Sequence, residues 1–285
     1  MRKIIGVCAV VALAARLCAF DDDLGLNTTG SVAEYTKIDY TITEKFGDYY
    51  RSPKAKYIHI FDASGRQVES DELTSRDMIV DKLLYNYDTE GRVSSTVCTD
   101  GDGKIQWKNI YTYDENGNRS DESQYNANDE LVNRSIFKYV GENQIEEAFY
   151  NADGALLGKF ITKLDDKGRK AELAQYNEEG SLEVRQTYSY NDAGKLSEVA
   201  YSDVLGRMVR KTVYRFDASY SVTEEQTYNA QNKLAVRVIF KYDAYGNVTK
   251  ATTYNVAEKF GTTVNELAGI VEYTYKYGSG KPSAE

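Results

Sequence analysis

The stretch YTYDENGNR, residues 111–119, decides the fold. A run of alternating residues that ends in tyrosine is followed by Asp-Glu-Asn-Gly. The side chain of Asp114 accepts a hydrogen bond from the backbone ahead, and Gly117 tolerates a left-handed backbone. This pattern is typical of a type I turn closed by a glycine bulge, a common connection between antiparallel strands. The stretch therefore predicts the end of one strand, a tight turn and the start of the next strand.

Close copies of this stretch recur along almost the whole chain. The position of Asp114 is repeated at intervals of 26 residues, with one interval of 25, at Asp62, Asp88, Asp114, Val140, Asp165, Asn191, Asp217 and Asp243. A second series lies between them and is led by Tyr125, Tyr150, Tyr176, Tyr228 and Tyr254. A fixed period of this kind indicates a repeat architecture. Each repeat has two similar halves, and each half contains one strand and one turn.

Between the turns, apolar residues alternate with a period of two, as in LAVRVIFKY, residues 234–242. This period is typical of strands with one apolar face. Successive strands joined by tight turns run antiparallel. The sequence therefore predicts an all-β fold, in which tandem repeats of about 26 residues form a long antiparallel meander of about 16 to 18 strands in a curled sheet. Asn143 and Tyr220 replace the turn glycine, so their turns are predicted to be strained or rearranged.

The repeated units carry a family resemblance. YNYDTEGRV, YTYDENGNR, YSYNDAGKL and FKYDAYGNV resemble the YD repeats of the Rhs family of bacterial cell-surface and toxin-shell proteins. The resemblance covers roughly residues 57 to 254. It implies a strip of antiparallel sheet that curls, in some members into a shell around a toxin. No toxin domain or self-cleaving segment is evident, so we expect a small exported member without a toxin domain.

The first residues predict export. The basic start MRK, the apolar run of residues 4–15 and a small-residue exit form a secretory signal peptide. The run is shorter than the roughly 20 residues of a membrane span. We expect cleavage after Ala19 and a protein of the periplasm, the cell surface or the medium, with a lipid anchor on Cys18 as the alternative. The expected parts are a signal peptide (1–19), N-terminal cap strands (20–56), a YD-like β-repeat domain (57–277) and a flexible tail (278–285).

Charge and cysteine content restrict the partners and the means of stabilisation. Removing residues 1–19 takes away three basic residues and no acidic one, so the net charge of −9 becomes −12. This balance repels phosphate backbones and anionic membrane surfaces, so nucleic acid is not an expected partner. Without an anchor the mature chain keeps only Cys98 and forms no internal disulfide. Burial and strand pairing must therefore stabilise it.

The sequence holds few groups for catalysis. His59 is the only histidine, and there is no phosphate-binding glycine loop, nucleophile elbow or set of zinc ligands. TDGDGK, residues 99–104, resembles the start of a calcium loop. Lys104 occupies the place of the third ligand, which favours a two-glycine hairpin turn instead. We expect no enzymatic activity, no cofactor and no metal.

The tyrosines suggest a binding role. Pairs such as Tyr111 and Tyr113 line up into ladders that stabilise a sheet. Partly exposed rings near strand ends are the candidates for ligand contact, namely Tyr125, Tyr176 and Tyr254. The main hypothesis is a non-enzymatic exported repeat protein that presents an extended β surface to a glycan or a protein at the bacterial cell envelope.

Two alternatives remain. One is a structural envelope or assembly module that self-associates through its sheet ends. The other is an outer-membrane β-barrel, which mid-strand charges such as Lys108 and Arg237 disfavour because lipid-facing positions must be apolar.

Overall fold

The structure is a computed structural model that describes residues 28–278. The expected signal peptide, Cys18 and all but the first residue of the expected tail lie outside this range. Strands and the turns between them make up the described part. The strands are β1 (Val32–Lys45), β2 (Asp48–Phe61), β3 (Gln67–Leu73), β4 (Ile79–Tyr87), β5 (Val93–Asp100), β6 (Ile105–Tyr113), β7 (Arg119–Asn126), β8 (Leu131–Val140), β9 (Gln144–Asn151), β10 (Leu156–Leu164), β11 (Lys170–Asn177), β12 (Leu182–Tyr190), β13 (Leu196–Ser202), β14 (Met208–Phe216), β15 (Val222–Asn229), β16 (Leu234–Tyr242), β17 (Val248–Lys259) and β18 (Thr262–Tyr277).

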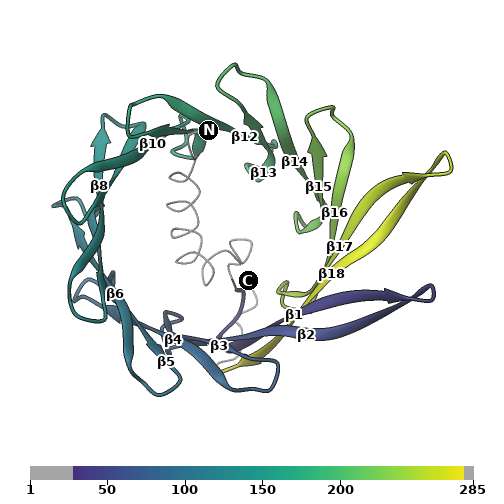
Figure 1. The fold of residues 1–285 in the computed structure, drawn as a ribbon, viewed down its shortest axis with the longest axis horizontal. Coiled ribbons are helices and arrows are strands. Elements are labelled where there is room, and N and C mark those ends of the chain that lie inside the picture. Colours follow the sequence, from purple (N-terminus) through teal and green to yellow (C-terminus); the bar gives the residue numbers. More distant parts are fainter. Residues whose placement is uncertain (1–27, 279–285) are drawn as a thin grey trace, which may run out of the picture.

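The strands form one 18-stranded sheet that closes on itself (Figure 1). Each strand pairs antiparallel with its neighbours in the chain, and β1 also pairs with β18, from Val32 opposite Tyr277 to Thr41 opposite Gly269. The expected all-β, antiparallel strand order is correct, but the expected open, curled sheet is wrong. Closure pairs the backbone groups of β1 and β18, which an open meander would leave as exposed edges. Between β1 and β18, self-association through sheet ends therefore finds a free edge only at the hairpin ends beyond Thr41 and Gly269.

The turns lie on two rims of the barrel. Rim A carries the turn between β2 and β3 and every second turn after it, together with residues 28–31 and Gly278. Rim B carries the others, from the β1–β2 turn to the β17–β18 turn. On rim A, Gly117 N donates to Asp114 O over 3.0 Å, and Asp114 Oδ1 accepts from the backbone N of Asn116 and of Asn118. With a φ of 80° at Gly117, the predicted turn is confirmed.

The two turns without the expected glycine differ from the others. Tyr220 adopts a left-handed φ of 60°, which is a strained conformation for an aromatic residue. At the other site the turn is shortened, because Val140 pairs directly with Gln144 and the left-handed residue is Gly141. The prediction of strain or rearrangement at Tyr220 and Asn143 is confirmed.

The two faces of the barrel wall differ in burial. On β6, Asn109 is buried and Trp107 and Tyr111 are half-buried, whereas Ile110 and Thr112 on the other face are exposed. Side chains on the inside of a closed cylinder converge, and those outside diverge. The more buried face, which carries the tyrosine ladders, is therefore the inner wall.

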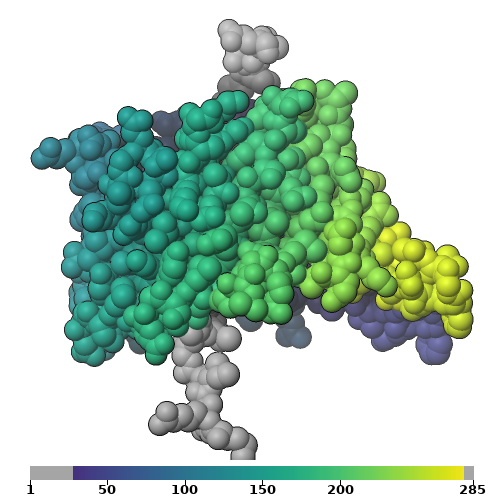
Figure 2. Space-filling model, turned by 90° about the horizontal axis from the view of Figure 1, so that it is seen from above, coloured from purple at the N-terminus to yellow at the C-terminus, as the bar shows by residue number. Residues whose placement is uncertain are grey.

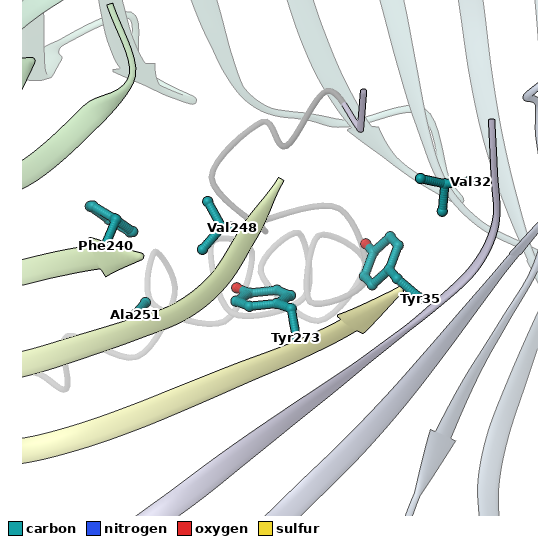
Figure 3. Close-up of a cluster of buried hydrophobic side chains, with 6 residues drawn as sticks. All are labelled: Val32, Tyr35, Phe240, Val248, Ala251 and Tyr273. Atoms are coloured by element: carbon teal, nitrogen blue, oxygen red, sulfur yellow. The ribbon is translucent and has the colours of Figure 1, made fainter. Parts of the chain in front are cut away.

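The inner wall is not a densely packed core. Among the described residues, only eleven apolar side chains are buried. One cluster of these lies where β16, β17, β18 and β1 run side by side (Figure 3), and it consists of Val32, Tyr35, Phe240, Val248, Ala251 and Tyr273. An 18-stranded barrel is too wide for its side chains to fill, so much of the inner wall stays accessible.

Candidate functional site

A row of polar residues crosses the inner wall on four neighbouring strands. Thr96 on β5 lies opposite Asn109 on β6, which lies opposite Gln124 on β7, which lies opposite Asn133 on β8. We call these four residues the polar strip. Asn109 is only 1% exposed. Asn133 Nδ2 donates to Gln124 Oε1 over 2.7 Å, so the two amides hold each other in place.

Tyr111 and Glu122 extend the polar strip toward rim A. They lie opposite each other, and Asn109 Nδ2 donates to Glu122 Oε1 (3.2 Å) and to the Tyr111 hydroxyl (3.4 Å). The Tyr111 hydroxyl also lies 3.2 Å from Thr96 Oγ1. The hydrogen bond from Nδ2 to the Glu122 carboxylate fixes the orientation of the Asn109 amide. The Oδ1 of Asn109 accepts no hydrogen bond from any residue of the described range. A buried acceptor without a partner is uncommon in folded proteins.

Arg119 completes this cluster from the start of β7. Its Nη1 donates to Glu122 Oε2 over 3.1 Å, and its guanidinium carbon lies 4.4 Å from the centroid of the Tyr111 ring. The contact with the ring face is a cation–π interaction. Burial, followed by the charge of Glu122, raises the pKa of Tyr111. The phenol therefore stays protonated and keeps its hydrogen available for donation.

The pKa values of Glu147 and Glu225 on the inner wall and of Glu224 on the outer face are shifted in opposite directions. Burial, followed by the charge of Glu122, raises the pKa of Glu147 on the inner wall to about 7. The neighbouring residues Glu224 and Glu225 point to opposite faces of β15. The hydrogen bond from Arg237 lowers the pKa of Glu224 on the outer face, whereas burial raises the pKa of Glu225 on the inner wall. Glu147 and Glu225 therefore lie at less hydrated positions than Glu224.

A row of carboxylates crosses the inner wall near rim B. Glu72 lies opposite Asp81, which lies opposite Asp100. Burial raises the pKa of Glu72, and the charges of Asp81 and Asp39 add to this; burial and then the charge of Asp100 raise the pKa of Asp81. No group of three or more His, Cys, Asp or Glu side chains between residues 28 and 278 is arranged to hold a metal ion.

His59 lies in a buried polar cluster on the inner wall of β2, β3 and β4. Its Nδ1 is 2.9 Å from Ser70 Oγ and 3.3 Å from Gln67 Nε2, and its ring stacks on Tyr35 with centroids 4.3 Å apart. Burial, then the charge of Lys37, lowers the pKa of His59 to about 4. A Ser-His pair can act as nucleophile and base, but Ser70 has no exposed surface for a substrate to reach. The cluster therefore serves to join three strands.

Cys98 lies on the inner wall of β5, directly opposite Trp107. It is 1% exposed, and burial raises the pKa of its thiol to about 12. A buried thiol with a raised pKa is a poor nucleophile and metal ligand.

The three tyrosines proposed as ligand contacts lie apart from the polar strip, on the outer face. Tyr125 lies opposite Lys108, Tyr176 opposite Lys159 and Tyr254 opposite Arg237. The ammonium nitrogens of Lys108 and Lys159 are each 5.5 Å from the ring they face. The three rings belong to β7, β11 and β17, so the structure does not bring them together. Their role in ligand contact stays a prediction.

The polar strip was not predicted, because an alternating aromatic face is typical of a packed core. A signal for it exists in IQWKNIYTY, residues 105–113, where Asn109 occupies a position on the same face as Trp107 and Tyr111. A polar amide on an otherwise aromatic face costs free energy unless it is hydrogen-bonded. Its presence there indicates a polar site on that face.

No protein-family model matches the chain. No curated protein matches it either. Three solved structures are similar in part. A porin-like protein from Bacteroides uniformis shares 11% sequence identity, with 87% of this chain and 98% of that chain covered and a TM-score of 0.47. A DUF1329 family protein from Desulfovibrio piger has 11% identity, coverages of 96% and 94% and a TM-score of 0.23, and a LolA superfamily protein from Nitrosomonas europaea has 8% identity, coverages of 88% and 88% and a TM-score of 0.21. At these identities and TM-scores, none of them bears on what this chain binds.

The expected kinship with YD-repeat proteins of the Rhs family is wrong. No family model supports it, and the structures found are a porin-like protein and members of the DUF1329 and LolA groups rather than YD-repeat proteins. The tyrosine-and-turn period has a simpler physical cause, since hairpins of equal length in one barrel place the same residues at the same height on every second strand.

No helix in residues 28–278 is long and apolar enough to cross a membrane.

Proposed function

We propose that the protein is a non-enzymatic exported binding protein of the cell envelope that holds a hydroxyl-rich ligand, such as a glycan, against the inner wall at the polar strip. The observation that carries this proposal is the combination of oriented amides and aromatic rings on β5 to β8. Sugar rings pack on aromatic faces, and their hydroxyl groups exchange hydrogen bonds with amides and carboxylates. Trp107, Tyr111 and Gln124 supply these groups, and the buried amide of Asn109 holds Tyr111 and Glu122 in place beneath them.

The outer face supports a barrel that stays in water. Cation–carboxylate pairs cross the middle of this face, including Lys82 with Glu69 (2.6 Å), Arg237 with Glu224 (2.5 Å) and Arg134 with Asp121. A barrel embedded in lipid needs an outward apolar band about 25 Å tall. The rows of ion pairs leave no such band here. This favours a binding barrel in an aqueous compartment, and the expected signal peptide of residues 1–19 supports an exported one.

The sole tryptophan of the chain provides a direct test. Trp107 lies two residues before Asn109 on the same face of β6, so a ligand that reaches the polar strip will change its fluorescence. Oligosaccharides from a panel of envelope glycans are titrated against the mature protein. We expect a saturable change in emission for at least one of them, and about tenfold weaker binding in Gln124→Ala, since one hydrogen bond to the ligand is lost.

A matched variant on the outer face completes the test. Tyr176→Ala removes a predicted ligand contact far from Trp107 and is expected to leave affinity unchanged. Urea unfolding of each variant establishes that it folds. Loss of binding in Tyr176→Ala with normal binding in Gln124→Ala would move the site to the outer face, and a panel without any binder would refute the proposal.

A further inference from the structure

Two hairpins of the barrel end in the same four residues. EKFG occurs at residues 44–47, between β1 and β2, and again at residues 258–261, between β17 and β18. Lys45 pairs with Asp48, and Lys259 pairs with Thr262, so each loop consists of Phe-Gly alone. Because β1 pairs with β18, the two hairpins are neighbours on rim B. The chain therefore presents the same tip twice at one place.

Both phenylalanines occupy an unfavourable backbone conformation. Phe46 has a φ of 56° and Phe260 a φ of 52°, and the glycine after each is also left-handed. Two successive positive φ values define a type I′ turn, for which Asn-Gly is the preferred pair. The rings are fully exposed, at 105% and 106%. A bulky apolar residue that is strained and uncovered gives no benefit to the fold, so it indicates an interaction.

The tips of the two hairpins project sideways, away from the barrel wall (Figure 2). The pairing of β1 with β18 ends at Thr41 and Gly269, while residues 42–45 continue in the hairpin with β2. At about 3.3 Å per residue, these four residues extend the hairpin by about 13 Å. Figure 2 shows the purple and yellow hairpins projecting from one side of the barrel. Arg51 Nη1 bonds to Glu272 Oε1 over 2.6 Å and ties the two hairpins together at their base.

The surroundings of the tips suit the surface of a lipid bilayer. Tyr49 and Tyr50 are 46% and 55% exposed, and tyrosines are enriched where a membrane meets water. Nearby basic and acidic side chains balance in number: Lys45, Arg51, Lys54 and Lys259 against Glu44, Asp48, Glu258 and Glu266. Each hairpin pairs the inward-facing backbone groups of its two strands almost to the tip, and shallow entry of a ring into the interface leaves the outward-facing groups in contact with water and headgroups.

The shape of the tips favours a lipid bilayer over a protein as the binding partner. Each ring stands fully exposed at the end of a two-residue loop, so it offers a second protein little area to cover. A fluid interface deforms around each ring and accepts apolar residues to a depth of about 5–10 Å. We propose that Phe46 and Phe260 insert into the interface of a lipid bilayer and dock the barrel there by the side from which the two hairpins project. This docking is independent of the glycan site proposed above.

Flotation with lipid vesicles tests the docking. The mature protein is mixed with phosphatidylcholine vesicles, with and without phosphatidylglycerol, at low and high salt. We expect binding to both compositions with little dependence on salt, because the charges at the tips balance. Phe46→Asn together with Phe260→Asn is expected to weaken binding by about tenfold for each ring removed. Asn-Gly is the preferred type I′ pair, so this variant is expected to fold at least as stably as the parent.

Tyr220→Asn is the matched control, since Tyr220 is also an exposed aromatic residue at a left-handed turn, but on rim A. It is expected to bind vesicles like the parent. The proposal is overturned if the parent does not float with vesicles, if the double variant floats equally well, or if binding requires phosphatidylglycerol and is lost in salt. It is also overturned if sedimentation shows that the tips join two copies of the chain, with a dimeric parent and a monomeric double variant.

Discussion

The hydroxyl of Tyr113 donates a hydrogen bond of 2.7 Å to the carbonyl oxygen of Val93, twenty residues earlier. The same bond at the same spacing recurs at Tyr87 with Gln67, Tyr139 with Arg119, Tyr190 with Lys170 and Tyr242 with Val222. Arg92, which bonds to Asp88 in the preceding turn, also lies over the Tyr113 ring at 4.4 Å. Each of these tyrosines therefore ties one turn of rim A to the next, which explains why tyrosine precedes the turns.

Loss of this hydroxyl is expected to destabilise the barrel. Tyr113→Phe removes the bond to Val93 and leaves the ring under Arg92 in place. The expected decrease in the free energy of unfolding is about 1 kcal/mol, measured by urea denaturation. Tyr125→Phe is the control, because this outer-face ring contacts Lys108 through its face. Equal decreases in the two variants would argue against the role of the rim bond.

Removal of the strain at Tyr220 is expected to stabilise the protein. Tyr220→Gly allows the φ of 60° without a steric cost, so we expect the free energy of unfolding to rise by about 0.5–1 kcal/mol. Tyr220→Ala keeps a Cβ atom and is expected to give no such gain. Thermal unfolding of both variants beside the parent measures the difference. A gain in the alanine variant as large as in the glycine variant would assign the effect to the ring instead.

Glu147 is expected to make the fold less stable as the pH rises. Its folded pKa of about 7 lies above the ordinary value of 4.5, so the folded state binds more protons between these two values, and stability falls as pH increases through this window. Glu147→Gln removes the buried charge. The variant should match the parent near pH 4 and exceed it by at most about 3 kcal/mol at pH 8, in urea unfolding at both values.

Glu224→Gln is a comparison in which the pH dependence of stability is expected to have the opposite sign. The folded pKa of Glu224 is lowered by its bond to Arg237, so this carboxylate contributes stability above its unfolded pKa and loses it in acid. The variant is therefore expected to be destabilised at pH 7 and less so in acid. A constant difference between Glu147→Gln and the parent from pH 4 to pH 8 would contradict the burial of Glu147.

Because His59 is the only histidine of the chain, its NMR signals can be followed in a pH titration without resonance assignment. The imidazole signals of His59 in NMR spectra are expected to report a pKa near 4, because burial disfavours the charged ring. Since the unfolded value is about 6.5, this residue makes stability fall as pH drops from 6.5 toward 4. Lys37→Gln removes the positive charge that also lowers the His59 pKa, so this variant is expected to raise the pKa part of the way toward 6.5. A value near 6.5 in the parent would refute the buried cluster with Ser70.

Strands, turns and their order follow from local features of the chain. The period of two in LAVRVIFKY places residues on alternate faces, and Asp114 and Gly117 form their turn through contacts within five residues. The strain at Tyr220 is equally local, because it depends on one residue and its own φ. These features carry their physical cause in neighbouring residues, so a sequence is sufficient to predict them.

Closure of the barrel and the identity of its inner wall depend on tertiary structure. β1 and β18 are joined by backbone hydrogen bonds. The side chains of either strand therefore do not identify the other strand as its partner. A curled sheet with packed aromatic residues and a wide barrel with the same residues on its inner wall share one alternating pattern. The curvature of the closed wall sets how closely side chains on neighbouring strands converge. It therefore decides that Trp107 and Tyr111 remain partly accessible and that Asn109 joins Gln124 in the polar strip.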